Sequence, residues 1–316
     1  NLSEGSSESE LETAIPLQYQ PRISPGELRR KLTPEVPPGC SRKGQRPTPY
    51  KNPTTTKRTT QLSLILNLLK VYKARSICEL YDKCTFAEWQ DVCTFPNYHD
   101  LIKTGLELYI KFNLDIQRLD MFKFAGHEAL KECPDLEQFN QLDLIFKVNN
   151  ICPRNFAKSL KEILNKETNK INCLRLIGVP NSGKTLLANL ICEPFIVCYN
   201  NNHGSENEFY LSNMLNKSII LCEELYITIA TAEDMKSVLG GQPIDVAKKF
   251  NEKQLLSRTP VIITSNYEKF GRGHLCPTDE KALSLRCHTF NFRATVKPTC
   301  KILSNQFYLY ILSHIY

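Results

Sequence analysis

Two patterns of hydrophobic and polar residues divide this chain. Between residues 61 and 147, apolar residues recur every three or four positions, as in LSLILNLLKVYKARSICELY and LEQFNQLDLIFKV. That spacing is typical of amphipathic helices and predicts a small α-helical region. From about residue 148 onward, four short runs are almost entirely apolar and alternate with helical stretches, which indicates strands buried on both faces of a parallel sheet. The predicted strands are Leu174–Ile177, Phe195–Tyr199, Ser218–Cys222 and Val261–Ser265.

The alternation of strands and helices predicts an α/β fold with three layers and a mostly parallel sheet. We expect this domain to span residues 148–293, after the helical region of residues 61–147. Residues 1–60 are polar, basic and rich in proline. Such a segment buries too little apolar surface to offset its ordering entropy, so we expect it to be disordered. The last stretch, residues 294–316, is apolar and aromatic, and its pattern fits a strand, a helix or sequence beyond the domain.

Composition narrows the class of protein only slightly. The net charge is +7, and the segment Arg22–Arg58 carries ten Lys or Arg against two Glu. A basic tail of this kind is a linker, a contact to nucleic acid or a nuclear address. The chain has 13 Cys without a C-x-x-C pair, so we expect reduced thiols in a cytosolic or nuclear protein rather than a zinc site. No apolar run is long enough to cross a bilayer, and we predict no membrane span.

The clearest chemical signal is GVPNSGKT, which matches the nucleotide-binding motif G-x-x-x-x-G-K-[ST] in full. It follows a predicted strand and begins a predicted helix, Leu186–Ile191, which is the context that the motif requires. Its glycines let the backbone wrap so that N–H groups at the helix N-terminus face an anion. In such loops the lysine reaches the β- and γ-phosphates of ATP, and the threonine hydroxyl binds Mg²⁺. The predicted nucleotide-binding residues are Gly178, Val179, Pro180, Asn181, Ser182, Gly183, Lys184 and Thr185.

Polar residues follow two of the other predicted strands. Glu223 and Glu224 come directly after Ser218–Cys222, at the carboxyl edge where ligands bind in open α/β sheets. We predict that Glu223 and Thr185 hold Mg²⁺, and that Glu224 orients and deprotonates the attacking water. Asn266 follows the last of the four strands, and we predict that it contacts the γ-phosphate or the attacking water. A simple turn residue is the alternative interpretation of Asn266.

A β-hairpin with a basic tip is predicted between these motifs. In VLGGQPIDVAKKFNEKQLLSRTP, the segments Ile244–Val246 and Gln254–Leu256 flank a basic and aromatic tip. A cation beside an aromatic ring suits a phosphate backbone and a stacked base, so we predict that Lys248, Lys249 and Phe250 bind DNA. A solvated hairpin tip is the alternative interpretation.

The order of these motifs resembles that of the superfamily 3 helicases of small DNA viruses. The similarity is closer to the helicase domain of the non-structural replication initiator of parvoviruses and densoviruses, over residues 148–293. Two segments carry this resemblance, NICPRNFAKSLKEILNKETNKINCLRLIGVPNSGKT and VLGGQPIDVAKKFNEKQLLSRTPVIITSN.

The resemblance implies an AAA+-like P-loop ATPase core that assembles as a homo-hexamer around single-stranded DNA. It also implies that ATP and Mg²⁺ drive 3′-to-5′ movement, and that the protein acts in the host cell nucleus. By motif position, Lys249 is the pore-hairpin lysine, Asn266 the sensor, and Arg286 the finger that reaches a neighbouring subunit's nucleotide. Phe250 departs from the His often found there in this superfamily, which keeps a stacking surface and loses a hydrogen-bond donor.

Two further functions stay open from the sequence. Another P-loop motor, for packaging or remodelling, would share the loop but would not explain the hairpin at Lys249. An inactive virus-derived copy that binds DNA without turnover is disfavoured by the intact Lys184, Glu223 and Glu224. No two His lie two positions apart, so the sequence predicts no nicking site of the kind that such initiators carry. The chain starts without Met, and we expect it to be part of a longer protein.

Overall fold

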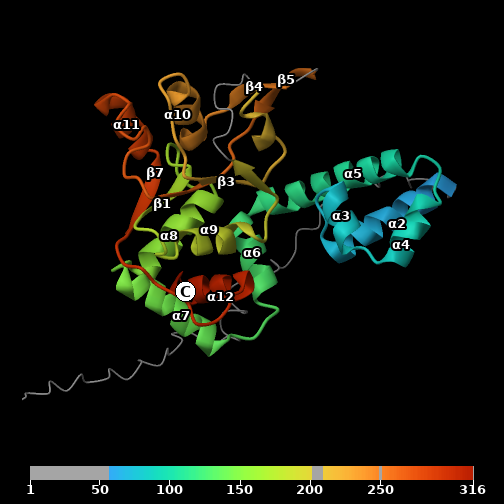
Figure 1. Cartoon of the computed structure of the whole chain (residues 1–316), viewed down its shortest axis with the longest axis horizontal. Helices are drawn as coiled ribbons and strands as arrows, with labels where there is room; N and C mark the ends of the chain where they lie inside the picture. The colour runs from blue at the N-terminus through green and yellow to red at the C-terminus, as the bar shows by residue number, and fades with distance from the viewer. Residues whose placement is uncertain (1–56, 201–208, 249–250, 316) are drawn as a thin grey trace, which may run out of the picture.

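The computed structural model describes residues 57–200, 209–248 and 251–315 (Figure 1). The tail that we predict to be disordered lies almost entirely outside these residues. Its last four positions are described, and they open the first helix, α2 (Lys57–Tyr72). Within the described residues, three hydrophobic cores organise the molecule, and two of them lie on opposite faces of one sheet.

The smallest core belongs to a helical bundle at the start of the described chain, drawn in blue and cyan in Figure 1. Its helices are α2, α3 (Ile77–Lys83), α4 (Phe86–Cys93) and α5 (Tyr98–Leu119). Ile65 and Leu69 of α2 are fully buried in this core. Thr85 and Glu88 form a reciprocal capping box that fixes the start of α4. Local capping and apolar residues at helical spacing therefore account for the first part of the predicted helical region, up to Leu119.

Helix α5 connects this bundle to the rest of the molecule (Figure 1). Near its end, the buried Gln117 side chain accepts a hydrogen bond from the Ile196 backbone N–H at 3.3 Å and donates one to the Pro194 carbonyl at 3.4 Å. The same side chain accepts a hydrogen bond from the Ser218 hydroxyl. The helical region is therefore bonded directly to the segments that lead into two strands of the sheet.

The centre of the molecule is a five-stranded sheet in which every neighbouring pair is parallel. Its strands are β1 (Cys173–Gly178), β2 (Val197–Asn200), β3 (Ile219–Glu223), β6 (Val261–Ser265) and β7 (Cys287–Phe292). They lie in the order β2-β3-β6-β1-β7, so the four predicted strands are all present. Ile177 pairs with both Ser265 and Asn291. The carboxyl ends of β1, β6 and β7 therefore reach the same edge of the sheet.

Helices cover both faces of this sheet, which confirms the predicted α/β architecture of three layers. They are α6 (Met121–Ala129), α7 (Leu136–Val148), α8 (Pro153–Leu164), α9 (Lys184–Cys192), α10 (Ala232–Gly240), α11 (Pro277–Ser284) and α12 (Ser304–Ile315), with a short 3₁₀ turn at Ser212–Met214. Leu174 and Leu176 face the larger core, with residues of α6 to α9 and α12. Cys173 faces the other core, with residues of α10 and α11. None of the helices in the described ranges has both the length and the apolar character to cross a membrane.

The predicted hairpin is present as an antiparallel pair, β4 (Ile244–Lys248) and β5 (Asn251–Leu256). Val246 and Leu256 anchor the pair in the core that contains α10 and α11. Lys249 and Phe250, which we predict to form its DNA-binding tip, lie outside the described residues, as does the side chain of Lys248. Their role in DNA binding stays a prediction.

The C-terminal stretch, whose pattern fits several structures, forms the buried helix α12. Phe307, Tyr308 and Tyr310 are fully buried in the larger core. The Tyr308 hydroxyl donates to the Ile191 carbonyl at 2.8 Å, and the Tyr310 hydroxyl donates to the Asp143 carboxylate at 2.5 Å. Helix α12 therefore packs on α7 and on α9, the helix that follows the glycine-rich loop, as part of the same core.

We expect Phe307→Ala to destabilise the protein by about 3 to 5 kcal/mol, the usual cost of deleting a buried aromatic ring. Leu303→Ala is the matched control, because its side chain is 47% exposed and its removal should cost less than about 0.5 kcal/mol. Urea unfolding followed by circular dichroism measures both. Equal small losses in the two variants would mean that α12 does not complete the core.

Candidate functional site

The glycine-rich loop joins β1 to α9, and its first glycine is required by a close backbone approach. Gly178 has a φ of 135°, and a Cβ on it would lie 1.8 Å from the carbonyl oxygen of Phe292 in β7. The Val179 N–H donates to that same oxygen at 2.9 Å. At the other end of the loop, Gly183 has a φ of 92° and is the N-cap of α9. Both glycines therefore have conformations that other residues rarely adopt.

The N-terminus of α9 forms an anion-binding surface. Its N-cap, Gly183, has no capping side chain, and the first turn contains no acidic residue. The first N–H groups of a helix have no partner within the helix, and the helix dipole places partial positive charge there. A phosphate group fits this position, which is the use that glycine-rich loops make of it.

Lys184 is held inside the loop. Its side chain is 6% exposed, and its Nζ donates to the carbonyls of Gly178 at 3.0 Å and Val179 at 2.5 Å. Two further acceptors are the Ser182 hydroxyl and Oδ1 of Asn266, each at 3.2 Å. Burial lowers the pKa of Lys184, and the charge of Glu224 partly opposes this effect. The four acceptors that described residues offer the ammonium are all neutral, and a phosphate oxygen would be a stronger partner.

Glu224 and Asn266 meet at the carboxyl edge of the sheet. Glu224 follows β3 with a φ of 49°, and its N–H donates to the Thr264 carbonyl at 2.8 Å. Its two carboxylate oxygens accept from the Asn266 N–H at 3.0 and 3.3 Å, and the Ser265 hydroxyl donates at 3.4 Å. The structure thus brings together three of the predicted catalytic residues: Lys184, Glu224 and Asn266.

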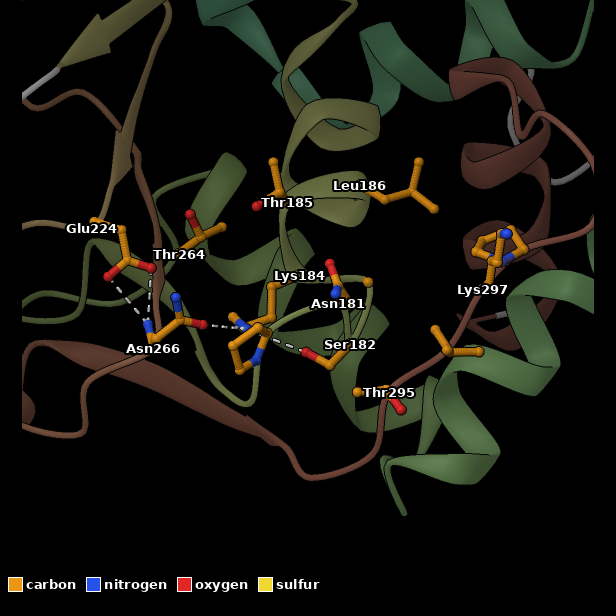
Figure 2. A pocket seen from close by; sticks show the side chains of 14 residues that line it. Asn181, Ser182, Lys184, Thr185, Leu186, Glu224, Thr264, Asn266, Thr295 and Lys297 are labelled. Atoms are coloured by element: carbon orange, nitrogen blue, oxygen red, sulfur yellow. Dashed lines mark hydrogen bonds between the residues drawn. The ribbon is translucent and has the colours of Figure 1, made fainter.

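A cavity of about 920 Å³ contains these residues. Figure 2 shows Glu224 and Asn266 on one side of Lys184, and Leu186 and Lys297 on the other. The cavity is therefore longer than the phosphate cradle alone. Its lining residues are Pro180, Asn181, Ser182, Gly183, Lys184, Thr185, Leu186, Glu224, Thr264, Asn266, Thr295, Val296, Lys297 and Pro298.

Sequence reasoning missed the cavity wall formed by residues 295–298. This segment is attached to the loop through its backbone, because the Val296 N–H donates to the Asn181 carbonyl at 2.8 Å. Just before it, the Ala294 N–H donates to Oδ1 of Asn149, whose Nδ2 reaches the Ser182 carbonyl at 3.5 Å. These are backbone and amide contacts with no sequence motif, so no signal in the sequence could have found them.

The predicted Mg²⁺ ligands are only partly brought together. Thr185 lines the cavity, whereas Glu223 is exposed at the end of β3 and is not part of the cavity wall. Glu224 is the carboxylate that the cavity contains. No group of three or more His, Cys, Asp or Glu residues in the described part of the chain could hold a metal ion. The Thr185 hydroxyl and the Glu224 carboxylate at the cavity fit Mg²⁺ bound with a nucleotide, because such an ion takes one or two protein ligands beside the phosphates and waters.

Arg286 lies at the opposite edge of the sheet from the cavity. It precedes Cys287, which pairs with Cys173 at the start of β1, whereas the loop begins at Gly178. Cys173 and Gly178 are five residues apart in β1, so the level of Arg286 lies about 16 Å from the start of the loop along the strands. The Arg286 guanidinium donates to the Ala282 carbonyl at 2.5 Å. Arg286 therefore does not serve the cavity of its own chain, and its role as a finger toward a neighbouring subunit stays a prediction.

These features define a P-loop α/β fold, in which a parallel sheet presents a glycine-rich loop and a buried lysine at its carboxyl edge. The family of parvovirus non-structural protein NS1 matches residues 109–307, more than half of the chain, and the chain belongs to this family. The matched range includes the loop, both acidic residues and the segment 295–298.

Individual relatives agree with this assignment. The chain is 28% identical over 151 residues to the initiator protein NS1 of Bombyx mori densovirus, and 32% identical over 135 residues to that of bovine parvovirus 1. The matches cover 46% and 41% of this chain, but only 16% and 15% of the two relatives. The structure also resembles that of JCV helicase, with a TM-score of 0.50, 14% identity, and coverage of 73% of this chain and 77% of that one. That likeness supports the fold.

Proposed function

We propose that this chain is the ATPase and helicase part of a viral DNA replication initiator of superfamily 3. The observation that carries this proposal is the convergence of Lys184, Glu224 and Asn266 on one cavity, in a chain of the NS1 family. A nucleotide-binding loop alone is shared by many kinases and motors, whereas this set of residues supports hydrolysis.

The proposed roles follow from the positions of the side chains. Bound ATP supplies the phosphoanhydride bond that is broken, and Mg²⁺ supplies positive charge beside the phosphates. Lys184 and the N–H groups of α9 would bind the β- and γ-phosphates, and the Thr185 hydroxyl would hold the metal. Glu224 takes a proton from the attacking water, since its carboxylate lies in the cavity wall beside Asn266 and accepts the Asn266 N–H at 3.0 Å. Asn266 orients the same water or the γ-phosphate.

The proposed partners are single-stranded DNA and further copies of this chain in a hexameric ring. The cavity contains two cations, Lys184 and Lys297, and lacks an arginine among its described lining residues. Transition-state charge in P-loop enzymes is often neutralised by an arginine from another subunit, and Arg286 is the residue that we assign to this task. The hairpin β4–β5 would face the DNA. We propose movement from 3′ to 5′ and action in the host cell nucleus.

Strand displacement on tailed duplexes tests the proposal. With ATP and Mg²⁺, the protein should separate a duplex that has a 3′ single-stranded tail and leave one with only a 5′ tail intact. Hydrolysis without any strand separation would favour a different P-loop motor. Absence of hydrolysis together with DNA binding would favour an inactive DNA-binding copy.

We expect Lys249→Ala to weaken binding to single-stranded DNA and to flatten the dependence of the binding constant on salt, because one phosphate contact is lost per subunit. Basal hydrolysis without DNA should stay unchanged. Lys253→Ala is the control, since Lys253 is an exposed lysine on strand β5 of the same hairpin. Fluorescence anisotropy at several salt concentrations measures both variants, and equal salt slopes in the two would contradict a specific role of Lys249.

A further inference from the structure

Strand β1 contains one charged residue, Arg175, in an otherwise apolar sequence. Its side chain is 3% exposed. Neighbouring residues of a strand face opposite sides of a sheet, so Arg175 shares the face of Cys173 rather than that of Leu174 and Leu176. A buried cation in a central strand requires partners, because an unpaired charge is costly to bury.

Those partners are in the loop that directly follows Asn266. A terminal guanidinium nitrogen of Arg175 donates to the carbonyls of Tyr267 at 3.2 Å and Glu268 at 2.5 Å. The guanidinium carbon also lies 3.9 Å from the centre of the Phe270 ring, within the range of a cation–π interaction. Nε of Arg175 is buried and has no hydrogen-bond partner among the described residues. The guanidinium therefore points its terminal nitrogen at the loop, and this orientation leaves its buried Nε–H without an acceptor among the described residues.

The same loop is held from a second direction by Glu280 of α11. Its carboxylate accepts the Phe270 N–H at 3.0 Å and the Gly271 N–H at 2.7 Å. A Cβ on Gly271 would lie 2.4 Å from the Leu275 side chain, so any other residue here would force the loop or Leu275 to shift. Arg175 and Glu280 thus fix the carbonyl and N–H sides of one short segment.

The last residue of the loop, Arg272, contacts Glu224, which directly follows strand β3. The Arg272 side chain donates to the backbone carbonyl of Glu224 at 3.3 Å. Its guanidinium carbon lies 4.2 Å from the centre of the Tyr267 ring and 5.2 Å from that of Tyr226. Residues 267–272 therefore link two residues of the site. The segment directly follows Asn266, and its Arg272 side chain bonds to the backbone of Glu224.

We propose that Arg175 is a positioning residue for hydrolysis: by holding residues 267–272, it sets the orientation of Asn266 and, through Arg272, of Glu224. The inference rests on the proposed function, because it concerns the same hydrolytic site. Arg175 does not line the nucleotide cavity, so it acts through the loop rather than on a substrate. Misplacement of a catalytic group by about 1 Å is enough to lower a rate by up to two orders of magnitude.

The test compares Arg175→Lys with Leu174→Ala. Lysine keeps the charge but loses the planar fork that reaches two carbonyls and stacks on a ring. We expect kcat for ATP hydrolysis to fall by about tenfold or more, while the Kd for a fluorescent nucleotide stays the same. Leu174→Ala removes a buried side chain from the opposite face of the same strand, so it should lower stability and leave kcat per folded molecule unchanged.

Hydrogen exchange provides a readout that does not depend on hydrolysis. In Arg175→Lys without nucleotide, amides of residues 267–272 should exchange faster than in the wild type, and those of α9 should not. Unchanged exchange in this loop, or a faster loop with full kcat, overturns the inference. If the wild type hydrolyses no ATP, the proposed function fails, whereas the exchange result still decides whether Arg175 holds the loop.

A double variant adds a further check. Arg175 and Glu280 act on the same segment, so Arg175→Lys combined with Glu280→Gln should lower kcat by less than the product of the two single effects. If the fold-change in kcat of the double variant equals the product of the two single fold-changes, the residues act independently. That result would contradict positioning through a shared loop.

Discussion

Lys184→Ala is expected to reduce ATP hydrolysis to background, a loss of at least about a hundredfold. Lys184 is the cation of the loop, and its Nζ lies within hydrogen-bonding distance of Gly178, Val179 and Asn266. Among the described residues that line the cavity, the other cation is Lys297, which lies at the opposite end from Glu224 and Asn266 (Figure 2). A phosphate-release assay with ATP and Mg²⁺ measures the loss.

Loss of fold is not the expected cause of this effect. Burial lowers the pKa of Lys184, so protonation of this amine does not add to the stability of the folded protein, and the fold does not depend on the charge. The variant should therefore keep the circular dichroism spectrum and melting transition of the wild type. Lys158→Ala, which alters an exposed lysine of α8, is the control and should hydrolyse ATP normally. Wild-type hydrolysis by Lys184→Ala would refute the assignment of the loop.

Glu224→Gln is expected to lower hydrolysis by about a hundredfold to a thousandfold while leaving nucleotide binding intact. Glutamine has nearly the shape of glutamate and can still accept the Asn266 N–H, but it cannot take a proton from water. The variant should therefore bind a fluorescent nucleotide as tightly as the wild type and release phosphate far more slowly.

Glu223→Gln is the matched comparison, since it makes the same chemical change one residue earlier. Glu223 is exposed at the end of β3 and lies outside the cavity wall, so we expect its loss to cost less than about tenfold. A larger effect at Glu223 than at Glu224 would contradict the assignment of Glu224 as the residue that takes the proton from water.

Much of the sheet could be predicted because buried parallel strands leave a simple signal. The runs at β1 and β6 are apolar and flanked by turn residues, so their positions and the shared carboxyl edge followed from the sequence. Helix α12 could not be predicted in this way. Phe307, Tyr308 and Tyr310 are all fully buried, and a helix buried on every side loses the polar face that produces a helical period.

The candidate site was predictable where residues are adjacent in sequence, and not where the fold brings distant segments together. The motif identified Lys184, and the strand ends indicated Glu224 and Asn266. The contacts of Arg175 could not be predicted. Arg175 lies in a short apolar strand, and its partners are about 90 positions away in the chain, so no local pattern connects them. The wall at residues 295–298 depends on backbone hydrogen bonds to the loop, which no choice of side chain reveals.

The choice between Glu223 and Glu224 also depends on local geometry. Both residues follow the same apolar run, and the sequence assigns one to the metal and the other to the water. In the structure, a φ of 49° at Glu224 and the N–H bond to Thr264 place its side chain in the cavity. A backbone conformation of this kind is rare for residues other than glycine, and the sequence gives no indication of it here.

The rate of ATP hydrolysis, measured with and without single-stranded DNA, shows whether hydrolysis in this protein is coupled to DNA. The proposal predicts that single-stranded DNA raises the rate in the wild type, and that Lys184→Ala shows no hydrolysis in either condition. A wild-type rate that is the same with and without DNA would contradict the proposal that this P-loop ATPase uses ATP to act on DNA.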